Sequence, residues 1–396
     1  MIHILKSNKN YRYYWAASCV STIGDYIDDI AFAQLVYLIT ESTLLSSYVF
    51  AIKVVFTFLS IFTATYVDKY NKKRILVFTS LAQGSILAFL LILYRLNCLN
   101  APILIVFVTL QTVFSSFSTP AQNAILSCIV SKEDMLNARS SISIFMRFIQ
   151  IISYLCAGAI IASIGIGGAI FMDAITFLIS AILITFVTNK EESSQKFVSV
   201  HDYFENVREG FHFVASHKNI SNVLVVTFLG NALIAPVDGL MPAYFTQGEY
   251  NDYAYAAFMV GIAIGGIIGT WVLTKLQNKL SNEKLFSLGF CLGAVGMGLL
   301  YINHGVMTGF ASVFIGASVG FVSILNATIL QLTTPNTMIA RVFSIFKCIS
   351  FIASPIGIIF FGFTGEFLRM KVVFSLCAIL MLFTSFLTLG IVKEVK

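Results

Sequence analysis

Four ionisable side chains inside long apolar runs are the residues of this sequence best suited to do chemistry. Asp25, Asp28 and Asp29 lie in the run 14–39, and Lys53 lies in the run 43–66. Spacings of three and four residues place the carboxyl groups on one face of a helix. Because one Asp at the centre of a bilayer costs roughly 2.5–3.5 kcal/mol, the cluster is expected to face a watery cavity, to be partly protonated, or to be paired. Such carboxyl groups can load and release a proton or bind a cargo.

Lys53 is the nearest candidate partner for these acids. At about 1.5 Å per residue, Lys53 and Asp28 each lie roughly 15 Å from the outer ends of their runs. Equal depth allows an ion pair with Asp28 or Asp29, or a shared contact with a substrate. The alternative is that the Lys53 side chain extends to the outer surface.

Other polar groups inside apolar runs are weaker candidates for a cavity or a gate. Arg147 and Lys347 hold equivalent places in the two halves of the chain, and extension to the inner surface explains them equally well. The run 220–244 contains Asn231, Pro236, Asp238 and Pro242. Its two prolines are expected to break the helix and free backbone carbonyls, either at a gate or in a packed kink.

The elements that must position these residues are membrane-spanning helices. The chain has 396 residues, of which 58% are hydrophobic and 11% charged, whereas soluble domains usually have about 25% charged residues. Each long apolar run must form a helix in lipid. The predicted fold is all-α and integral to the membrane, with twelve spans at 14–39, 43–66, 75–94, 101–119, 142–164, 167–188, 220–244, 253–273, 284–302, 305–326, 342–363 and 371–392.

The distribution of Lys and Arg predicts the orientation. Nineteen lie on one side of the spans and three, Arg95, Arg369 and Lys371, on the other, with the remaining three inside spans. The richer side is cytoplasmic by the positive-inside rule, so both termini are expected in the cytoplasm of a plasma-membrane protein. Because these cations lie in short turns and form no patch, the formal charge of +6 does not indicate nucleic-acid binding.

The chain is expected to comprise an N-terminal six-helix bundle (1–188), a cytoplasmic linker (189–219) and a C-terminal six-helix bundle (220–396). Segments 123–147 and 326–347 share Asn-Ala, Ala-Arg and Ser-Ile-Phe in the same order. Each runs from the fourth into the fifth span of its half, so the halves are predicted to be parallel repeats. Residues 200–214 place apolar side chains at helical spacing, which predicts an amphipathic helix on the inner surface.

The loop after the second span carries a family motif. The residues Ala64-Thr65-Tyr66-Val67-Asp68-Lys69-Tyr70-Asn71-Lys72-Lys73-Arg74 resemble the G-x-x-x-D-R-x-G-R-K/R loop of major facilitator transporters. Ala64 and Asn71 replace its glycines, and Asn71 can adopt the left-handed backbone that Gly would supply. The resemblance implies a conformational latch in which Asp68 pairs with cations and helix ends. Here the nearest cations are Lys69, Lys72, Lys73 and Arg74, and the alternative is a merely basic cytoplasmic loop.

Further stretches resemble the macrolide-efflux and secretion-effector branch of the drug/proton antiporters, which includes siderophore and metallophore exporters. They are Thr119-Pro120-Ala121, Lys132-Glu133-Asp134-Met135-Leu136, Asp173-Ala174-Ile175-Thr176-Phe177, Arg208-Glu209-Gly210, Gln331 and Arg341-Val342-Phe343. The resemblance implies that the first and fourth helices of each half line the cavity. Its candidate lining groups are Gln111, Ser115, Ser116, Ser318, Ser323 and Asn326, which could equally join helices. Asp173 is interpreted as structural.

We therefore expect a proton-coupled secondary exporter of a small amphiphilic molecule, similar to macrolide and multidrug efflux proteins. Several acids beside Lys53 also suit a zwitterionic metallophore of the staphylopine type. Direct export of a divalent metal is disfavoured, because no intramembrane His accompanies the acids. No enzyme or P-loop motif occurs, and a channel or scaffold is disfavoured by the repeat and the loop motif. The expected partners are a small-molecule substrate, protons and the lipid bilayer, with no cofactor, no metal and a monomeric state.

Overall fold

The structure of this chain is a computed structural model that describes residues 5, 7–57, 59, 63, 66–67, 70–131, 134–188, 208–209, 211–248, 250, 252–335 and 338–391. Throughout these residues the regular structure is helical, with no strand. Residue contacts divide the chain into two compact units. Unit 1 comprises Met1–Thr40 and Ile52–Val200, and unit 2 comprises Glu41–Ala51 and His201–Lys396. The predicted boundaries at 188 and 220 remain a prediction.

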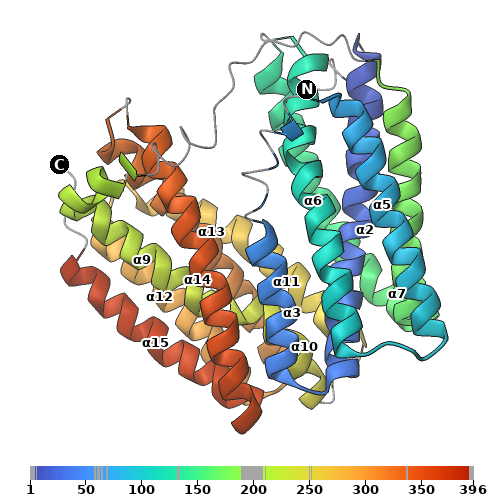
Figure 1. The fold of residues 1–396 in the computed structure, drawn as a ribbon. Helices are drawn as coiled ribbons and strands as arrows, with labels where there is room; N and C mark the ends of the chain where they lie inside the picture. Colours follow the sequence, from blue (N-terminus) through green and yellow to red (C-terminus); the bar gives the residue numbers. More distant parts are fainter. Residues whose placement is uncertain are drawn as a thin grey trace. The chain divides into compact units, whose positions relative to one another are not determined.

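The helices agree with the predicted spans in order and position (Figure 1). In chain order they are α2 (Lys9–Thr40), α3 (Thr43–Thr57), α5 (Lys72–Arg95), α6 (Ala101–Ile129), α7 (Met135–Thr185), α9 (Lys218–Ile234), α10 (Pro236–Gln247), α11 (Asp252–Leu276), α12 (Asn282–Leu299), the short 3₁₀ helix η1 (Leu300–Ile302), α13 (Gly305–Thr333), α14 (Ile339–Phe367) and α15 (Met370–Ile391). Among the described residues, nine helical segments are long and apolar enough to cross a membrane. Twelve spans result when α2, α3 and the division of α7 are included.

Several helices extend beyond the predicted spans. Helix α6 continues to Ile129 and α13 to Thr333, whereas the predicted spans end at residues 119 and 326. Hydropathy detects only the part of a helix that lies in hydrocarbon, and the backbone hydrogen bonds continue into more polar sequence. The predicted ends were therefore too short at these helices.

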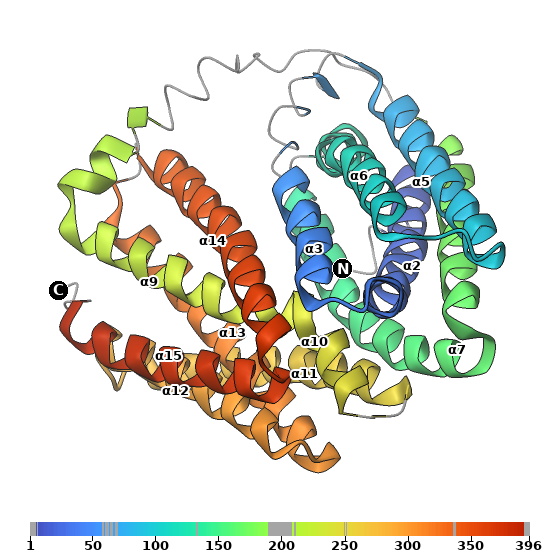
Figure 2. The same cartoon turned by 60° about the horizontal axis from the view of Figure 1, so that its bottom comes forward.

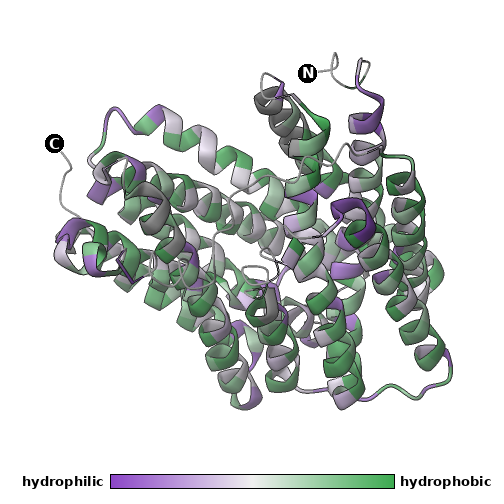
Figure 3. Ribbon diagram, turned by 45° about the horizontal axis from the view of Figure 1, so that its top comes forward, coloured by the Kyte–Doolittle hydropathy of each residue, from purple (hydrophilic) through white to green (hydrophobic). Residues whose placement is uncertain are grey.

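Large apolar side chains are exposed on the helices of both units, as expected for surfaces that face lipid. Phe78 of α5 is 64% exposed, and Phe383 and Phe386 of α15 are 60% and 71% exposed. Apolar residues make up most of the helices, and many polar residues lie near helix ends (Figure 3). A soluble protein would not leave so much apolar surface in water.

In unit 1, helices α2, α6, α5 and α7 form a closed ring of contacts (Figures 1 and 2). Two tyrosines of α2 connect it to its neighbours at one end of this ring by hydrogen bonds. The Tyr11 hydroxyl donates to the carbonyl of Ala138 in α7 at 3.0 Å, and the Tyr14 hydroxyl donates to the carbonyl of Gln122 in α6 at 3.2 Å. The interior enclosed by these helices contains the acids of α2.

Gly165 divides α7 into two membrane spans. Its backbone has φ 72° and ψ 176° in an otherwise helical segment. Only glycine adopts this conformation without strain, because a side-chain carbon would collide with the backbone. The division falls between the predicted spans 142–164 and 167–188, which confirms that two spans share this continuous apolar stretch.

In unit 2, α11 and α13 pack backbone against backbone. A side-chain carbon at Gly265 or Gly269 of α11 would collide with backbone carbonyls of α13, and one at Gly316 or Gly320 of α13 would collide with carbonyls of α11. Four-residue spacing of small residues lets membrane helices approach closely and make Cα–H···O contacts. These glycines form the α11–α13 glycine contact.

The seventh predicted span is broken once. Helix α9 ends at Ile234 and α10 begins at Pro236, whereas Pro242 lies inside α10, which continues to Gln247. The expectation that both prolines break the helix was therefore wrong for Pro242. Pro236 has no N–H, so it cannot bond the carbonyl of Ala232 four residues earlier. Gly357 of α14 lies directly against this carbonyl, with no room for a side-chain carbon.

Replacing Gly357 by Ala is expected to destabilise the protein by about 1–3 kcal/mol, because the added methyl group forces α14 away from α9. The measurement is the unfolding temperature of the purified protein in detergent. The control is Gly309→Ala, since a side-chain carbon at Gly309 of α13 would meet no atom within 4 Å. Equal unfolding temperatures for the two variants would contradict the close contact.

Candidate functional site

The acids of α2 line a cavity of about 280 Å³ inside unit 1. Its walls come from α2, α3, α5, α6 and α7, so it lies within the ring of helices described above. The lining residues are Asp25, Asp28, Asp29, Phe32, Lys53, Gln83, Ile86, Leu87, Leu90, Phe107, Val108, Gln111, Thr112, Ser115, Asp173 and Phe177. We call this space the acid cavity. It brings together six of the predicted site residues, which are Asp25, Asp28, Asp29, Lys53, Gln111 and Ser115.

Lys53 forms an ion pair with Asp29 in the acid cavity. The Lys53 Nζ atom donates to Asp29 Oδ1 at 2.6 Å. The two side chains are 51% and 43% exposed, so the pair lies in an accessible space and not in close packing. Exposed pairs of this kind contribute about 0–1 kcal/mol. The pair therefore fixes the position of the Asp29 carboxylate more than it stabilises the fold.

Two buried acceptor atoms in the acid cavity have no protein donor. Among the described residues, neither Asp28 Oδ1 nor Gln111 Oε1 has a hydrogen-bond partner. The Gln111 amide is oriented through its other end, because Nε2 donates to the carbonyl of Gln83 at 3.3 Å. Unpaired buried acceptors are costly. Their presence in one cavity indicates that they accept from a ligand, from water or from a bound proton.

Asp173 is a fourth carboxyl group in the acid cavity. It is 2% exposed, and the Thr176 hydroxyl donates to its carbonyl oxygen at 2.8 Å and to its Oδ1 at 3.0 Å. Gly24 of α2 faces this pair so closely that a side-chain carbon would collide with both residues. The sequence interpretation treated Asp173 as structural only. Its hydrogen bonds fit that role, but its place in the cavity wall adds a further acid beside those of α2.

Gln83 is a lining residue that the sequence interpretation did not select. It is 8% exposed in α5, and its side chain faces the acid cavity. The available signal was a single Gln in the middle of the apolar run 75–94. A polar side chain in that position is expensive unless it faces other polar groups.

A second, polar cavity of about 160 Å³ adjoins the acid cavity and shares Asp25, Gln83, Ser115 and Phe177 with it. Most of its other lining side chains carry hydroxyl groups, namely Tyr14, Ser18, Ser21, Thr22, Ser80, Ser118, Thr119 and Ser180. A polar cavity of this size can hold water. Asp25 therefore lies between a hydroxyl-lined space and the acid cavity.

Unit 2 has a corresponding cavity of about 260 Å³ that lacks charged lining residues. It brings together Asn231 of α9 and Asn326 of α13. The Asn231 Nδ2 atom donates to the carbonyl of Thr227 at 2.9 Å and to the Ser350 hydroxyl at 3.4 Å. The Asn326 Oδ1 atom is buried without a partner among the described residues. Predicted Ser318 and Ser323 also line this cavity.

The other predicted gate residues do not join these cavities. Lys347 and Asp238 are exposed on α14 and α10, and neither lines any cavity described above. Arg147 belongs to α7, but its side chain lies outside the described part of the structure. The equivalence of Arg147 and Lys347 remains a prediction from the repeat.

The motif loop is described only in part. Asp68 and Lys69 lie outside the described residues, so their pairing remains a prediction. Asn71 has φ −63° and ψ 110°, and its side chain accepts from the Arg74 backbone N–H at 3.0 Å. Asn71 therefore does not use the left-handed backbone that Asn tolerates, and it caps the N-terminus of α5 instead. Lys73 donates to the carbonyl of Thr185 at 2.6 Å, at the end of α7.

Solved structures with a similar fold include membrane transporters. The crystal structure of nucleoside transporter NupG superposes with a TM-score of 0.79 over 98% of this chain and 100% of that chain, at 9% identity. A bacterial homologue of the iron transporter ferroportin gives 0.71 over 97% and 98%, at 14% identity. At 9% and 14% identity, these likenesses show that the chain has the fold of these transporters.

The chain belongs to the transmembrane secretion effector family of major facilitator transporters. The model of this family matches residues 6–394 of the chain. The staphyloferrin A transporter of Staphylococcus aureus is 26% identical over 306 residues, which cover 75% of each chain. Macrolide efflux protein A of Streptococcus pyogenes is 24% identical over 375 residues, which cover 89% of each chain. These matches confirm the predicted family and agree with the branch that the sequence motifs resemble.

Proposed function

We propose that this chain is a proton-coupled exporter that moves a small amphiphilic molecule out of the cell by alternating access. The acid cavity is the observation that supports this proposal most directly. Three carboxyl groups of α2 share it with one cation, and no described residue is a hydrogen-bond partner of Asp28 Oδ1. A carboxyl group in this setting can bind either a proton or a cargo, and such competition couples the two.

The unpaired acceptors bear on the chemistry of the cargo. Gln111 Oε1 can only accept a hydrogen bond, and Asp28 Oδ1 accepts whenever the carboxyl group is ionised. A cargo with a protonated amine would supply N–H donors and positive charge together. Similarity to macrolide efflux protein A supports a cargo of this cationic, amphiphilic kind. The hydroxyl-lined cavity beside Asp25 would give protons a separate route to the acids.

A zwitterionic metallophore is the second candidate cargo. Lys53 lies in the same cavity as the acids, and its ammonium group could contact a carboxylate of a cargo when the pair with Asp29 opens. Similarity to the staphyloferrin A transporter supports this alternative. The two candidates differ in whether the cargo carries carboxylates.

The test is uptake into inside-out vesicles with an imposed pH gradient, beside exometabolite profiling of a deletion strain. Radiolabelled macrolide and a staphylopine-type metallophore serve as the two probes. The proposal expects accumulation when the vesicle interior is acidic and loss of accumulation when an ionophore collapses the gradient. Accumulation that ignores the gradient would exclude proton coupling. A deletion strain with unchanged exometabolites and unchanged drug susceptibility would exclude export of either class.

The proposed orientation, with both termini in the cytoplasm, can be tested with native cysteines. Cys98 is exposed in the turn after α5, on the predicted outer side, and Cys128 is exposed near the predicted inner end of α6. A membrane-impermeant maleimide should label Cys98 in intact cells, and Cys98→Ser should remove most of that label. Cys128→Ser is the matched control and should leave it unchanged. Labelling that is lost in Cys128→Ser and kept in Cys98→Ser would show that the orientation is the opposite of the proposed one.

We also propose that the motif loop acts as a conformational latch through Asp68. The variant Asp68→Asn is expected to fold normally and to transport more slowly, because losing an interaction of roughly 0.5–2 kcal/mol shifts the balance between inward-facing and outward-facing states. Lys284→Gln, which removes a charge from the first turn of α12 on the predicted cytoplasmic side, is the control. Wild-type transport rates in Asp68→Asn would contradict the latch.

A further inference from the structure

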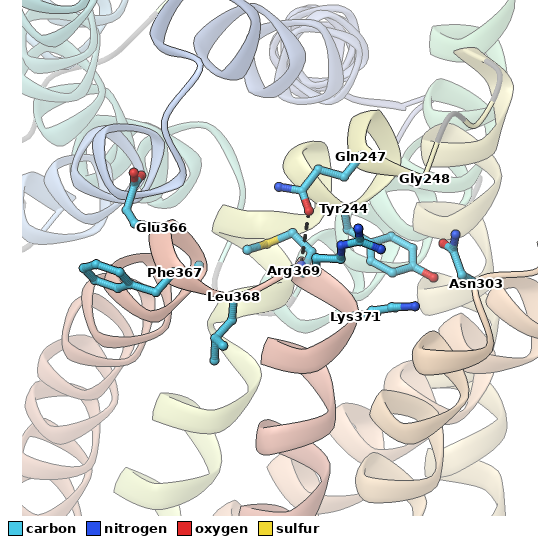
Figure 4. A pocket seen from close by; sticks show the side chains of 11 residues that line it. Tyr244, Gln247, Gly248, Asn303, Glu366, Phe367, Leu368, Arg369 and Lys371 are labelled. Atoms are coloured by element: carbon cyan, nitrogen blue, oxygen red, sulfur yellow. Dashed lines mark hydrogen bonds between the residues drawn. The ribbon is translucent and has the colours of Figure 1, made fainter.

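A cavity of about 580 Å³ in unit 2 is lined by the ends of α10, α14 and α15 and by the turns beside them (Figure 4). Tyr244 and Gln247 come from α10, and Asn303 comes from the turn after η1. The remaining side comes from the end of α14, the turn after it and the start of α15, with Glu366, Arg369 and Lys371 respectively. We call this cavity the turn pocket. It shares no lining residue with the acid cavity.

Two cations occupy one side of the turn pocket. Arg369 and Lys371 extend toward the side where Asn303 and the Tyr244 ring lie (Figure 4). The Lys371 ammonium group lies 5.4 Å from the centre of the Tyr301 ring. A cation–π contact of this length holds the ammonium group in place and leaves N–H donors free to face the pocket.

The acid of the turn pocket is already engaged elsewhere. Glu366 Oε1 accepts from the Ser42 hydroxyl at 2.6 Å, the Leu44 backbone N–H at 2.8 Å and the Thr43 hydroxyl at 3.1 Å. Its carboxylate thereby caps the N-terminus of α3, where a helix favours negative charge. In Figure 4 it lies away from the two cations and points in another direction.

Within the part of the chain that the structure describes, no carboxylate balances the charge of the two cations. The single ion pair found among the described residues joins Lys53 to Asp29, so neither Arg369 nor Lys371 is paired with a described carboxylate. Only three of the 25 Lys and Arg residues lie on the predicted outer side, and two of them are here. Cations are depleted on the outer side of membrane proteins. Two cations within three residues on that side therefore indicate a role beyond orientation.

We propose that the turn pocket binds an oxyanion, a phosphate or a carboxylate group. The Arg369 guanidinium would hold two of its oxygens, as the fork of five N–H donors favours, and Lys371 would supply a second charge. Asn303 has the left-handed φ of 50°, which Asn tolerates, and this backbone presents its side chain at the pocket. The N-terminus of α15, which begins at Met370, adds partial positive charge on the same side.

The oxyanion could belong to a lipid headgroup or to a soluble molecule. Phe367 and Leu368 line the pocket beside Arg369, and Phe367 is 74% exposed at the end of a membrane-spanning helix. The phosphate of a lipid headgroup could therefore enter the turn pocket while the acyl chains lie outside it against Phe367. A free anion needs no such apolar neighbour, so the two sources predict different results.

The test uses the full purified chain and three probes, which are inorganic phosphate, phosphatidylglycerol and phosphatidylcholine. Binding is followed by thermal stabilisation and by native mass spectrometry of retained lipid. Wild type is expected to bind inorganic phosphate or phosphatidylglycerol in a salt-sensitive manner. The variant Arg369→Gln with Lys371→Gln should weaken binding at least tenfold, and the exchange Arg369→Lys with Lys371→Arg should restore most of it.

Arg95→Gln is the matched control, because Arg95 is the remaining cation on the predicted outer side and does not line the turn pocket. If the double variant fails to fold, Arg369→Gln alone provides the comparison. Tighter binding of phosphatidylglycerol than of phosphate would assign the site to lipid, and the reverse would assign it to a soluble anion. Equal binding by wild type and the Gln variants, or no binding of any probe, would overturn the proposal. None of these measurements requires transport, so they do not depend on the proposed function.

Discussion

Asp28→Asn is expected to abolish proton-coupled transport and to leave a folded protein in the membrane. The amide has the same size as the carboxyl group but cannot carry the proton. No protein hydrogen bond to Oδ1 is lost, because that atom has no partner among the described residues. A positioned proton-transfer group typically contributes roughly 10²–10⁴-fold to a rate, so transport driven by a pH gradient should fall by about 100-fold or more.

The measurement uses proteoliposomes with a pH-sensitive dye, so that proton flux and cargo flux are recorded together. Asp28→Asn should still allow cargo to move down its own gradient, because alternating access does not itself require the proton. Asp134→Asn makes the same chemical change at an exposed residue before α7 and is the matched control. Full coupling of proton and cargo flux in Asp28→Asn would show that Asp25 or Asp29 carries the proton instead.

Lys53→Met is expected to reduce expression and coupled transport, and Asp29→Asn in the same chain should restore part of both losses. Removing Lys53 alone leaves the Asp29 carboxylate without its cation beside Asp25 and Asp28. The three neighbouring carboxyl groups of α2 then repel one another with no cation beside them. Without the ammonium group the acids take up a proton more readily, so the pH optimum of transport should move upward.

A double-mutant cycle measures this coupling. Because both side chains are about half exposed, we expect an interaction free energy of only about 0.5–1 kcal/mol. The comparison cycle combines Lys53→Met with Asp28→Asn, and a control cycle combines it with Asp134→Asn. Strict additivity in the Asp29 cycle would show that the pair has no energetic role. Stronger coupling to Asp28 would show that the working partner differs from the one in this structure.

Hydropathy and charge bias were enough to predict the helices, because lipid forces each apolar run into one helix. The spacing of Asp25, Asp28 and Asp29 was likewise enough to place them on one face. The choice of Asp29 as the partner of Lys53 could not be predicted. Neighbouring positions on a helix point about 100° apart, and only packing against other helices fixes the rotation of α2.

The site residues that the sequence did not predict depend on contacts between helices far apart in the chain. Asp173 reaches the acid cavity because Gly24 lets the second half of α7 approach α2. Gln83 belongs to it because of how α5 is rotated within the ring. The sequence around Asp173 or around Gln83 does not specify that either side chain faces the acid cavity. The same holds for Glu366, whose binding to the start of α3 joins residues more than 320 positions apart.

The α11–α13 glycine contact sets an order for biogenesis. These two helices are separated in sequence by α12, so they cannot meet until α13 has left the translocon. Until then, the shallow groove along Gly265 and Gly269 is open to lipid, which fits a bare backbone poorly. A bulky residue there would not hinder insertion of α11, which stays apolar. It would instead arrest the later closure of the pair, and the product would be an inserted but unassembled chain exposed to quality-control proteases.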